Sequence, residues 1–430
     1  MKIRLTIAVL LLAMTFLTSC ATAPAPGASL RVGASSGVIT PPTGTLLAGY
    51  DLNRRSTGVH DDLFAKAVVF DDGKTPVALV TLDCIGLMYP DVQALRQEAS
   101  SRCTALAIPP ERIIVSSIHT HCGPDTIGIW GPSEGETGRD ETYIKSLIAT
   151  AAEQVARAAK SRVPAHLVRA EAPTPEWVVN DSEPGDTEKT FPILQCLDAS
   201  GASIVTLTNL ACHPTVLDGD TTDVSADWVG AFYAKMASQL SGEHVFVQGA
   251  IGGWIQPVTP ERTFALAQRY GEDAASRTLA ALKNAAKLQG GPIRFASLPI
   301  DMPIENPVYE QMAAAKLTPR LMDKTTKTEV AWFALGDAEF ATHPGESAPC
   351  FARASRDLMR GESKFIIGLG LDELGYICKT DYFDQPDKYP SGKYLVSMSP
   401  GRSAGEILQR ALEQLIPQEK SKKHLAYLAY

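Results

Sequence analysis

The sequence predicts an α/β fold, in which a mixed β-sheet is flanked by helices within a single domain. Three observations lead to this prediction. Short apolar runs rich in β-branched residues alternate along the chain with longer segments of helical periodicity. No internal repeat and no change of composition divides the chain. The 430 residues, of which 45% are hydrophobic, are enough for a sizeable core.

In the first part of the chain, strands are expected over residues 63–70 and 77–83. Both runs are apolar, and Asp71-Asp72-Gly73 between them is typical of a hairpin turn. Apolar residues at helical spacing predict helices over 90–106 and 139–161. The polar, proline-rich segment 171–190 is expected to be a loop over the functional site.

The same criteria predict the elements of the second part. The two strands on either side of Gly336-Asp337 are expected to form a hairpin. Strands are expected over 202–212, 245–248, 329–335, 339–343 and 365–369. Helices are expected over 224–240, 347–359 and 404–415, and the segment 259–288 is expected to form one long helix or two broken ones.

The N-terminal segment is expected to be a bacterial lipoprotein signal peptide. Lys2 and Arg4 precede an apolar run over 5–17 that is too short to span a membrane comfortably. Leu17-Thr18-Ser19-Cys20 resembles a lipoprotein cleavage site, so an exported protein would begin at a lipidated Cys20 and be anchored on the periplasmic or cell-surface side of a membrane. The alternative is an ordinary secretory signal in which Cys20 is incidental. The expected boundaries are a signal peptide over 1–20, a flexible tether over 21–29, a folded domain over 30–415 and a C-terminal tail over 416–430.

Charge and cysteine content limit the classes of partner and site. A net charge of -8 argues against nucleic acid, whose binding relies on clustered Lys and Arg, and it says nothing about protein partners. The cysteines after Cys20 include no C-x-x-C pair, and their odd number cannot all pair within one chain. Cys84, Cys196 and Cys212 lie in apolar runs that are typical of buried thiols.

Two histidines follow the strand expected over 112–118, in the run His119-Thr120-His121. Successive side chains on a strand alternate faces, so His119 and His121 are expected to project to one side, about 7 Å apart. Imidazoles at the carboxyl end of a buried strand lie where open α/β sheets bind ligands. For this pair alone, the interpretation that one or both histidines are merely hydrogen-bonded at a strand end stays open.

Three further stretches place ligand-type residues at strand ends or beside glycines. They are Cys212-His213-Pro214, the run 342–346 that contains His343 and Glu346, and the run 372–376 that contains Glu373 and Tyr376. Catalytic zinc typically takes three protein ligands from His, Asp, Glu or Cys and leaves one position for water. The four stretches together favour a metal site, with a thiolate ligand from Cys122 or Cys212 as an alternative.

Six short runs of the sequence, in the order in which they occur, resemble motifs of the catalytic domain of the neutral (alkaline, non-lysosomal) ceramidases. The resemblance covers residues 30–415. The resemblance rests on the runs 57–67, His119-Thr120-His121-Cys122-Gly123-Pro124, 209–215, Ser225-Ala226-Asp227, Pro344-Gly345-Glu346 and Glu373-Leu374-Gly375-Tyr376. It implies a single catalytic domain and a zinc-dependent hydrolase of linear amides.

The resemblance also implies a division of roles among the candidate residues. His119, His213, Glu346 and Tyr376 would be the zinc ligands. His121 would face the substrate and transfer a proton, and Tyr389 is the candidate for a second catalytic tyrosine. Zinc lowers the pKa of bound water and polarises a carbonyl. A free imidazole beside it could take the water proton and return it to the leaving amine.

Two stretches do not match these ceramidases. A Gly-Asp-Val-Ser-Pro motif is replaced here by the run 252–257, Gly-Gly-Trp-Ile-Gln-Pro, and an Asn-Arg-Ser-Pro motif by the run 180–184, Asn-Asp-Ser-Glu-Pro. Ceramide itself is therefore not implied as the substrate. We expect an exported, lipid-anchored zinc hydrolase that cleaves an amide or ester by metal-activated water, with an N-acyl lipid among its candidate substrates. The alternatives are a zinc esterase or amidase for a small periplasmic substrate, and a surface lipoprotein of this fold that binds a ligand without catalysis.

Overall fold

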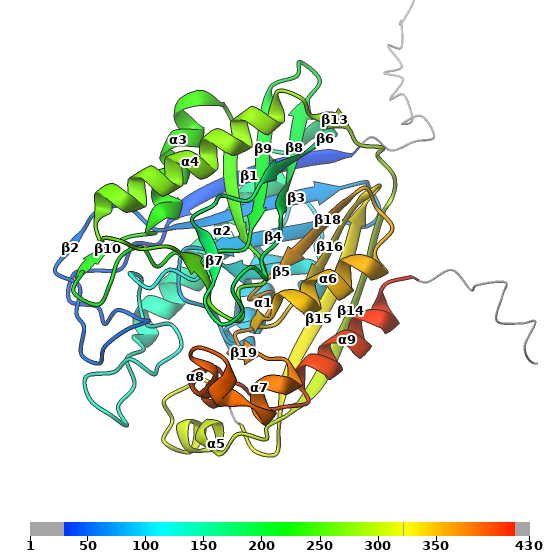
Figure 1. The fold of residues 1–430 in the computed structure, drawn as a ribbon. Helices are drawn as coiled ribbons and strands as arrows, with labels where there is room; N and C mark the ends of the chain where they lie inside the picture. The colour runs from blue at the N-terminus through cyan, green and yellow to red at the C-terminus, as the bar shows by residue number, and fades with distance from the viewer. Residues whose placement is uncertain (1–29, 321, 418–430) are drawn as a thin grey trace, which may run out of the picture.

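The computed structural model describes residues 30–320 and 322–417, which contain two large β-sheets and the helices that cover them (Figure 1). The larger sheet has the strand order β11-β9-β8-β6-β1-β3-β4-β5, with β13 paired to β6. Its pairs are antiparallel except β4 with β5 and β9 with β11. The strands are β1 (Arg31–Val38), β3 (Phe64–Asp71), β4 (Val77–Leu82), β5 (Ile113–Ser117), β6 (Val163–Pro173), β8 (Thr190–Asp198), β9 (Ser203–Leu210), β11 (Glu243–Gln248) and β13 (Ala286–Lys287).

The two ends of this strand order come back into contact, because β11 touches β4 and β5. Helices α1 (Tyr89–Arg102) and α2 (Glu141–Lys160) pack together, with α2 against β1 and β3. Helices α3 (Trp228–Gln239) and α4 (Phe264–Leu282) form a second pair against β11 and β6. Since β9 and β5 each lead into a histidine-bearing loop, this closure brings the two loops toward one another.

The smaller sheet has the strand order β14-β15-β16-β18. Because successive side chains on a strand point to opposite faces, its two faces contribute to two different hydrophobic clusters. Phe333, Phe340 and Phe365 stack on the face that joins the main core, with neighbouring rings 4.4 and 4.5 Å apart. Trp332 and Ile366 belong to the cluster on the other face, which α6 and α9 cover (Figure 1). The elements are β14 (Ile293–Pro303), β15 (Thr325–Leu335), β16 (Ala338–Thr342), β18 (Ser363–Ile367), α6 (Pro349–Leu358) and α9 (Ala404–Leu415).

Three two-stranded ladders and three short helices complete the described part. The ladders pair β2 (Gly58–Val59) with β10 (Asp223–Val224), β7 (Val178–Asn180) with β12 (Ile255–Pro257), and β17 (Glu346–Ser347) with β19 (Tyr376–Ile377). The short helices are α5 (Pro307–Ala314), α7 (Thr380–Asp384) and α8 (Gly392–Ser397), and 3-10 turns span Pro110–Arg112 and Pro386–Lys388. In Figure 1 the three short helices gather at the lower end of the molecule.

The predicted α/β architecture is confirmed, although the helices flank two mixed sheets rather than one. The sequence does not predict β6 or β14. Both contain prolines and alternate buried with exposed residues, and proline weakens a strand prediction because it cannot donate to the ladder. The loop expected over 171–190 is wrong in part, because the end of β6, all of β7 and the start of β8 occupy it.

The signal peptide, the tether and all but the first two residues of the expected C-terminal tail lie outside the described residues. Within 30–320 and 322–417, no helix combines the length and the apolar composition that crossing a membrane requires. The seven cysteines after Cys20 are all free thiols, and the three that the sequence analysis assigned to the interior are buried.

Candidate metal centre

His119 lies just beyond β5, in a left-handed backbone conformation with φ of 72°. Because β5 ends at Ser117, the expected strand alternation does not extend to His119 and His121. The N–H of His119 instead donates to the carbonyl of Cys84 at 3.0 Å. The rings of the two histidines nevertheless end with their centroids 5.1 Å apart. A left-handed residue other than glycine is strained, and such strain concentrates at functional sites.

His213 follows β9, and the buried side chain of Gln248 ties its loop to that of His119. The Gln248 amide group donates to the carbonyls of Ile118 at 2.8 Å and Cys212 at 3.0 Å. Its Oε1 accepts the N–H of Cys212 at 3.1 Å. One side chain therefore sets the distance between the two histidine loops. The sequence analysis missed Gln248, and the available signal was a polar residue ending an apolar strand.

Glu346 and Tyr376 are brought together by the parallel ladder β17–β19, in which they are direct partners. The N–H of Glu346 donates to the carbonyl of Gly375 at 2.9 Å. Gly375 has φ of +78°, and a Cβ there would lie 2.3 Å from the carbonyl oxygen of Met398, so the turn before Tyr376 requires glycine. This ladder carries two side chains, thirty positions apart in sequence, to one edge of the site.

The Nε2 atoms of His119 and His213 converge on the Glu346 carboxylate, at 3.6 Å from Oε1 and 3.0 Å from Oε2. Their Nδ1 atoms face the backbone carbonyls of Ile85 at 2.6 Å and Ile255 at 2.8 Å. A carbonyl oxygen can only accept, so each Nδ1 carries a hydrogen, and a neutral ring directs its Nε2 lone pair at the carboxylate. Burial lowers the pKa of His119 to about 4, which keeps its ring neutral at pH 7.

The Nε2 of His213 and Oε2 of Glu346 lie within hydrogen-bonding distance, and a cation shared by the two rings and the carboxylate, either a proton or a metal ion, would stabilise this arrangement. Histidines that bind metal ions usually donate their other ring N–H to a carbonyl or carboxylate, as His119 and His213 do here. His119 and His213, with the Glu346 carboxylate beside them, are therefore candidate metal ligands.

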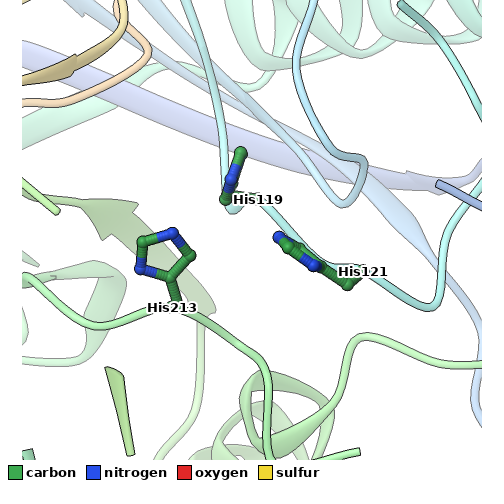
Figure 2. A group of neighbouring side chains, drawn as sticks. All are labelled: His119, His121 and His213. Carbon is green, nitrogen blue, oxygen red and sulfur yellow. The ribbon is translucent and has the colours of Figure 1, made fainter. Parts of the chain in front are cut away.

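His121 completes a group of three histidines in which one nitrogen from each ring lies within 4.8 Å of the others (Figure 2). Among the described residues, neither ring nitrogen of His121 has a hydrogen-bond partner. Burial lowers the pKa of His121, and the nearby His119 and His213 lower it further. A Cβ at Gly49, whose φ is +97°, would lie 2.3 Å from Cγ of His121, so glycine makes room for this ring.

His119, His121, Glu346 and Tyr376 line one pocket, and His213 is not part of that lining. Much of the remaining wall is apolar and includes Ile85, Met88, Ile127, Trp130, Met312 and Met322. An apolar pocket with a few convergent polar groups is the usual form of a site for a small molecule or an acyl group.

Tyr389, the sequence candidate for a second catalytic tyrosine, is not in the pocket lining. Its ring packs on that of Tyr382, with the centroids 4.2 Å apart. Tyr394 in α8 does line the pocket, with its ring centroid 6.1 Å from that of Tyr376. The role of Tyr389 stays a prediction, and Tyr394 is a candidate that the sequence analysis missed.

The thiolate alternative finds no support in the geometry. The group of metal-ligating side chains found among the described residues contains neither Cys122 nor Cys212. Burial raises the pKa of both cysteines.

His343 is not part of this group of three histidines and has a structural role. It is fully buried, with Nδ1 2.6 Å from the hydroxyl of Ser347 and Nε2 3.0 Å from that of Ser355. Burial lowers the pKa of His343 from its usual 6.5 to about 3. The histidine noted beside Glu346 in sequence is therefore a structural residue.

The lowered pKa of His343 predicts that the folded protein loses stability as the pH falls. Between pH 6.5 and about 3, His343 takes up a proton only in the unfolded state, so stability falls as pH falls, by up to about 1.4 kcal/mol per pH unit. Urea denaturation between pH 7.5 and 5 should show a smaller loss of stability in His343→Gln than in wild type. The variant His166→Gln, at an exposed position, is the control, and its free energy of unfolding should fall by as much as that of wild type. An equal loss in His343→Gln would contradict this prediction.

Solved structures of other proteins share this fold. A neutral ceramidase from Pseudomonas aeruginosa superposes with a TM-score of 0.72 at 14% identity, over 91% of this chain and 75% of that chain. A ceramidase complexed with C2 gives a TM-score of 0.74 at 15% identity, over 90% of this chain and 75% of that chain. No family model and no curated protein matches the sequence. The chain has the fold of the neutral ceramidases, which confirms the predicted resemblance at the level of the fold.

The two stretches that depart from the ceramidase motifs lie side by side in the structure. Asn180 pairs with Ile255 in the β7–β12 ladder, and the N–H of Ser182 donates to the carbonyl of Gly253 at 3.2 Å. Trp254, in the same stretch, donates its indole N–H to the phenol oxygen of Tyr376 at 2.6 Å. The two departures therefore form one local unit that touches a candidate metal ligand.

Proposed function

We propose that this protein is a zinc-dependent hydrolase that cleaves an amide or ester bond of an N-acyl compound with the help of metal-activated water. The observation that carries the proposal is the convergence of His119 Nε2 and His213 Nε2 on the Glu346 carboxylate. Both rings are held in the tautomer that presents this nitrogen by their hydrogen bonds to backbone carbonyls. The fold shared with neutral ceramidases supports the same class of reaction.

In this proposal His119, His213, Glu346 and Tyr376 hold the zinc. When bound, zinc lowers the pKa of a water molecule and polarises the carbonyl of the scissile bond. His121 lines the pocket with both ring nitrogens free of hydrogen bonds, so it can accept the proton of the water and pass it to the leaving group. The apolar wall of the pocket receives the acyl part of the substrate and excludes water.

A substrate screen tests the proposal. Zinc-loaded protein is expected to release free acid from N-acyl amides or the corresponding esters, and a chelator should abolish this activity. Acyl chains of increasing length distinguish an N-acyl lipid from a small periplasmic substrate. Tight binding of these compounds with no turnover at any zinc loading would favour the alternative of a ligand-binding lipoprotein.

We further propose that the protein is exported and held on a membrane through a lipidated Cys20, a residue outside the described part. The support is the run Leu17-Thr18-Ser19-Cys20 and the composition of the tether that follows it. Cys20→Ser should leave the protein unprocessed or release it from the membrane fraction. The measurement is cell fractionation with mass spectrometry of the mature N-terminus. Wild-type protein that is soluble and begins at another residue would refute the anchor.

A further inference from the structure

One buried carboxyl group in the pocket has no assigned role. Glu373 is 4% exposed and lines the same pocket as His119, His121 and Glu346. Its Oε1 accepts the N–H of Gly375 at 2.8 Å, whereas its Oε2 has no hydrogen-bond partner among the described residues. A buried polar atom without a partner destabilises the folded state, so the unpaired Oε2 points to a functional role.

The fold does not supply a partner for this oxygen. The neighbouring cation, Arg320, forms its ion pair with Asp372, whose Oδ1 also accepts the N–H groups of Tyr89 and Glu373 at 2.8 Å each. Asp372 thus has a structural role that Glu373 does not share.

The position of Glu373 is set by close packing. A Cβ at Gly86 would lie 2.9 Å from Cγ of Glu373, so the side chain lies directly against the backbone of that glycine. The pocket wall also includes Ile85 and Met88, which lie on either side of Gly86 along the chain, and Leu374, which follows Glu373. The free oxygen is therefore a polar group held in a mostly apolar wall, as expected of a group that contacts a ligand.

We propose that Glu373 is a specificity-determining residue, whose free Oε2 forms a hydrogen bond with a hydroxyl group of the substrate close to the scissile bond. A hydroxyl both donates and accepts, so it satisfies Oε2 whether the carboxyl group is ionised or protonated. The substrates preferred by this protein are accordingly amides or esters with an apolar acyl group and a hydroxyl on the leaving group. This inference rests on the proposed hydrolase function for the identity of the ligand.

The test compares two ligands of equal shape, N-(2-hydroxyethyl)octanamide and N-propyloctanamide, by titration calorimetry with the zinc-loaded protein. Wild-type protein should bind the hydroxyl compound about tenfold more tightly, since a site built for a hydroxyl rejects the analogue that lacks it. Where the compounds are hydrolysed, the ratio of kcat/KM replaces the ratio of affinities. Equal values for the two ligands in wild-type protein would overturn the proposal without any variant.

Variants then assign the preference to this residue. Glu373→Met, which keeps the length but no polar atom, should bind both ligands equally and retain its zinc. Glu373→Gln, which keeps a hydrogen-bonding group in place, should retain part of the preference. Glu310→Met, on the exposed face of α5, is the matched control and should behave as wild type. A wild-type ratio in Glu373→Met would overturn the proposal, and if that variant does not fold, the wild-type ratio and Glu373→Gln decide it.

The design separates this inference from the hydrolase proposal. Binding with a hydroxyl preference but no turnover would refute the hydrolase and support the role of Glu373. Hydrolysis of both compounds with equal kcat/KM would do the opposite.

Discussion

His213→Ala is expected to purify with almost no zinc, whereas the wild-type protein should carry about one zinc per chain, as a catalytic site of this kind does. His213 Nε2 lies 3.0 Å from Oε2 of Glu346, and its ring is oriented by the carbonyl of Ile255. Removing the ring deletes one of the ligands that the backbone orients. Hydrolysis should fall by at least about a thousandfold, because a Lewis-acidic metal supplies several kcal/mol of transition-state stabilisation.

Metal analysis by mass spectrometry, beside an activity assay, measures this effect. His166→Ala, at an exposed position in β6, is the control and should keep both zinc and activity. The strictest version of the test removes His119 and His213 together. Full zinc content in that double variant would show that the metal, if present, is held elsewhere.

His121→Ala is expected to keep nearly all its zinc and yet lose hydrolysis by about 10² to 10⁴, the usual contribution of a general base. The geometry allows two arrangements. The three histidines each offer a nitrogen within 4.8 Å of the others, so His121 could be a ligand. In the arrangement that we propose, Tyr376 is the ligand instead and His121 stays free for proton transfer.

Two observations favour the second arrangement. The Nδ1 atoms of His119 and His213 both bond to backbone carbonyls, which is the pattern of a fixed ligand, whereas neither ring nitrogen of His121 is held in this way. Tyr376 is paired with Glu346 in the β17–β19 ladder, and its phenol oxygen accepts a hydrogen bond from Trp254. The bond from Trp254 uses one lone pair of this oxygen and leaves another available for a metal.

Tyr376→Phe is the matched variant that separates the two arrangements. If Tyr376 is the ligand, this change should weaken zinc binding while His121→Ala does not. The reverse pattern, in which zinc and activity disappear together in His121→Ala and zinc persists in Tyr376→Phe, would assign His121 to the metal.

The candidate site residues could be proposed from the sequence because the signals are local. His119 follows an apolar strand, and Glu346 and Tyr376 each follow a glycine within a short motif. The same holds for α9 (Ala404–Leu415) and for the hairpin formed by β15 and β16, whose periodicity and turn residues lie within a few positions of one another.

The parts that could not be predicted depend on contacts between distant segments. β14 pairs with β15 along its whole length, and this pairing stabilises a strand whose prolines argue against it. Tyr394 reaches the pocket, and Tyr389 does not, because of how the short helices after Tyr376 pack. No local pattern distinguishes these two tyrosines.

The sequence by itself determined the fold class and singled out His119, His121 and His213 as ligand-type residues, because strand ends, glycine turns and ligand-type side chains are local properties. Only the tertiary structure decided how these residues meet. The left-handed turn at His119, the bridge made by Gln248 and the ladder between Glu346 and Tyr376 all arise from contacts across the chain. The unpaired oxygen of Glu373 became visible in the same way, because whether a polar atom lacks a partner depends on everything packed around it.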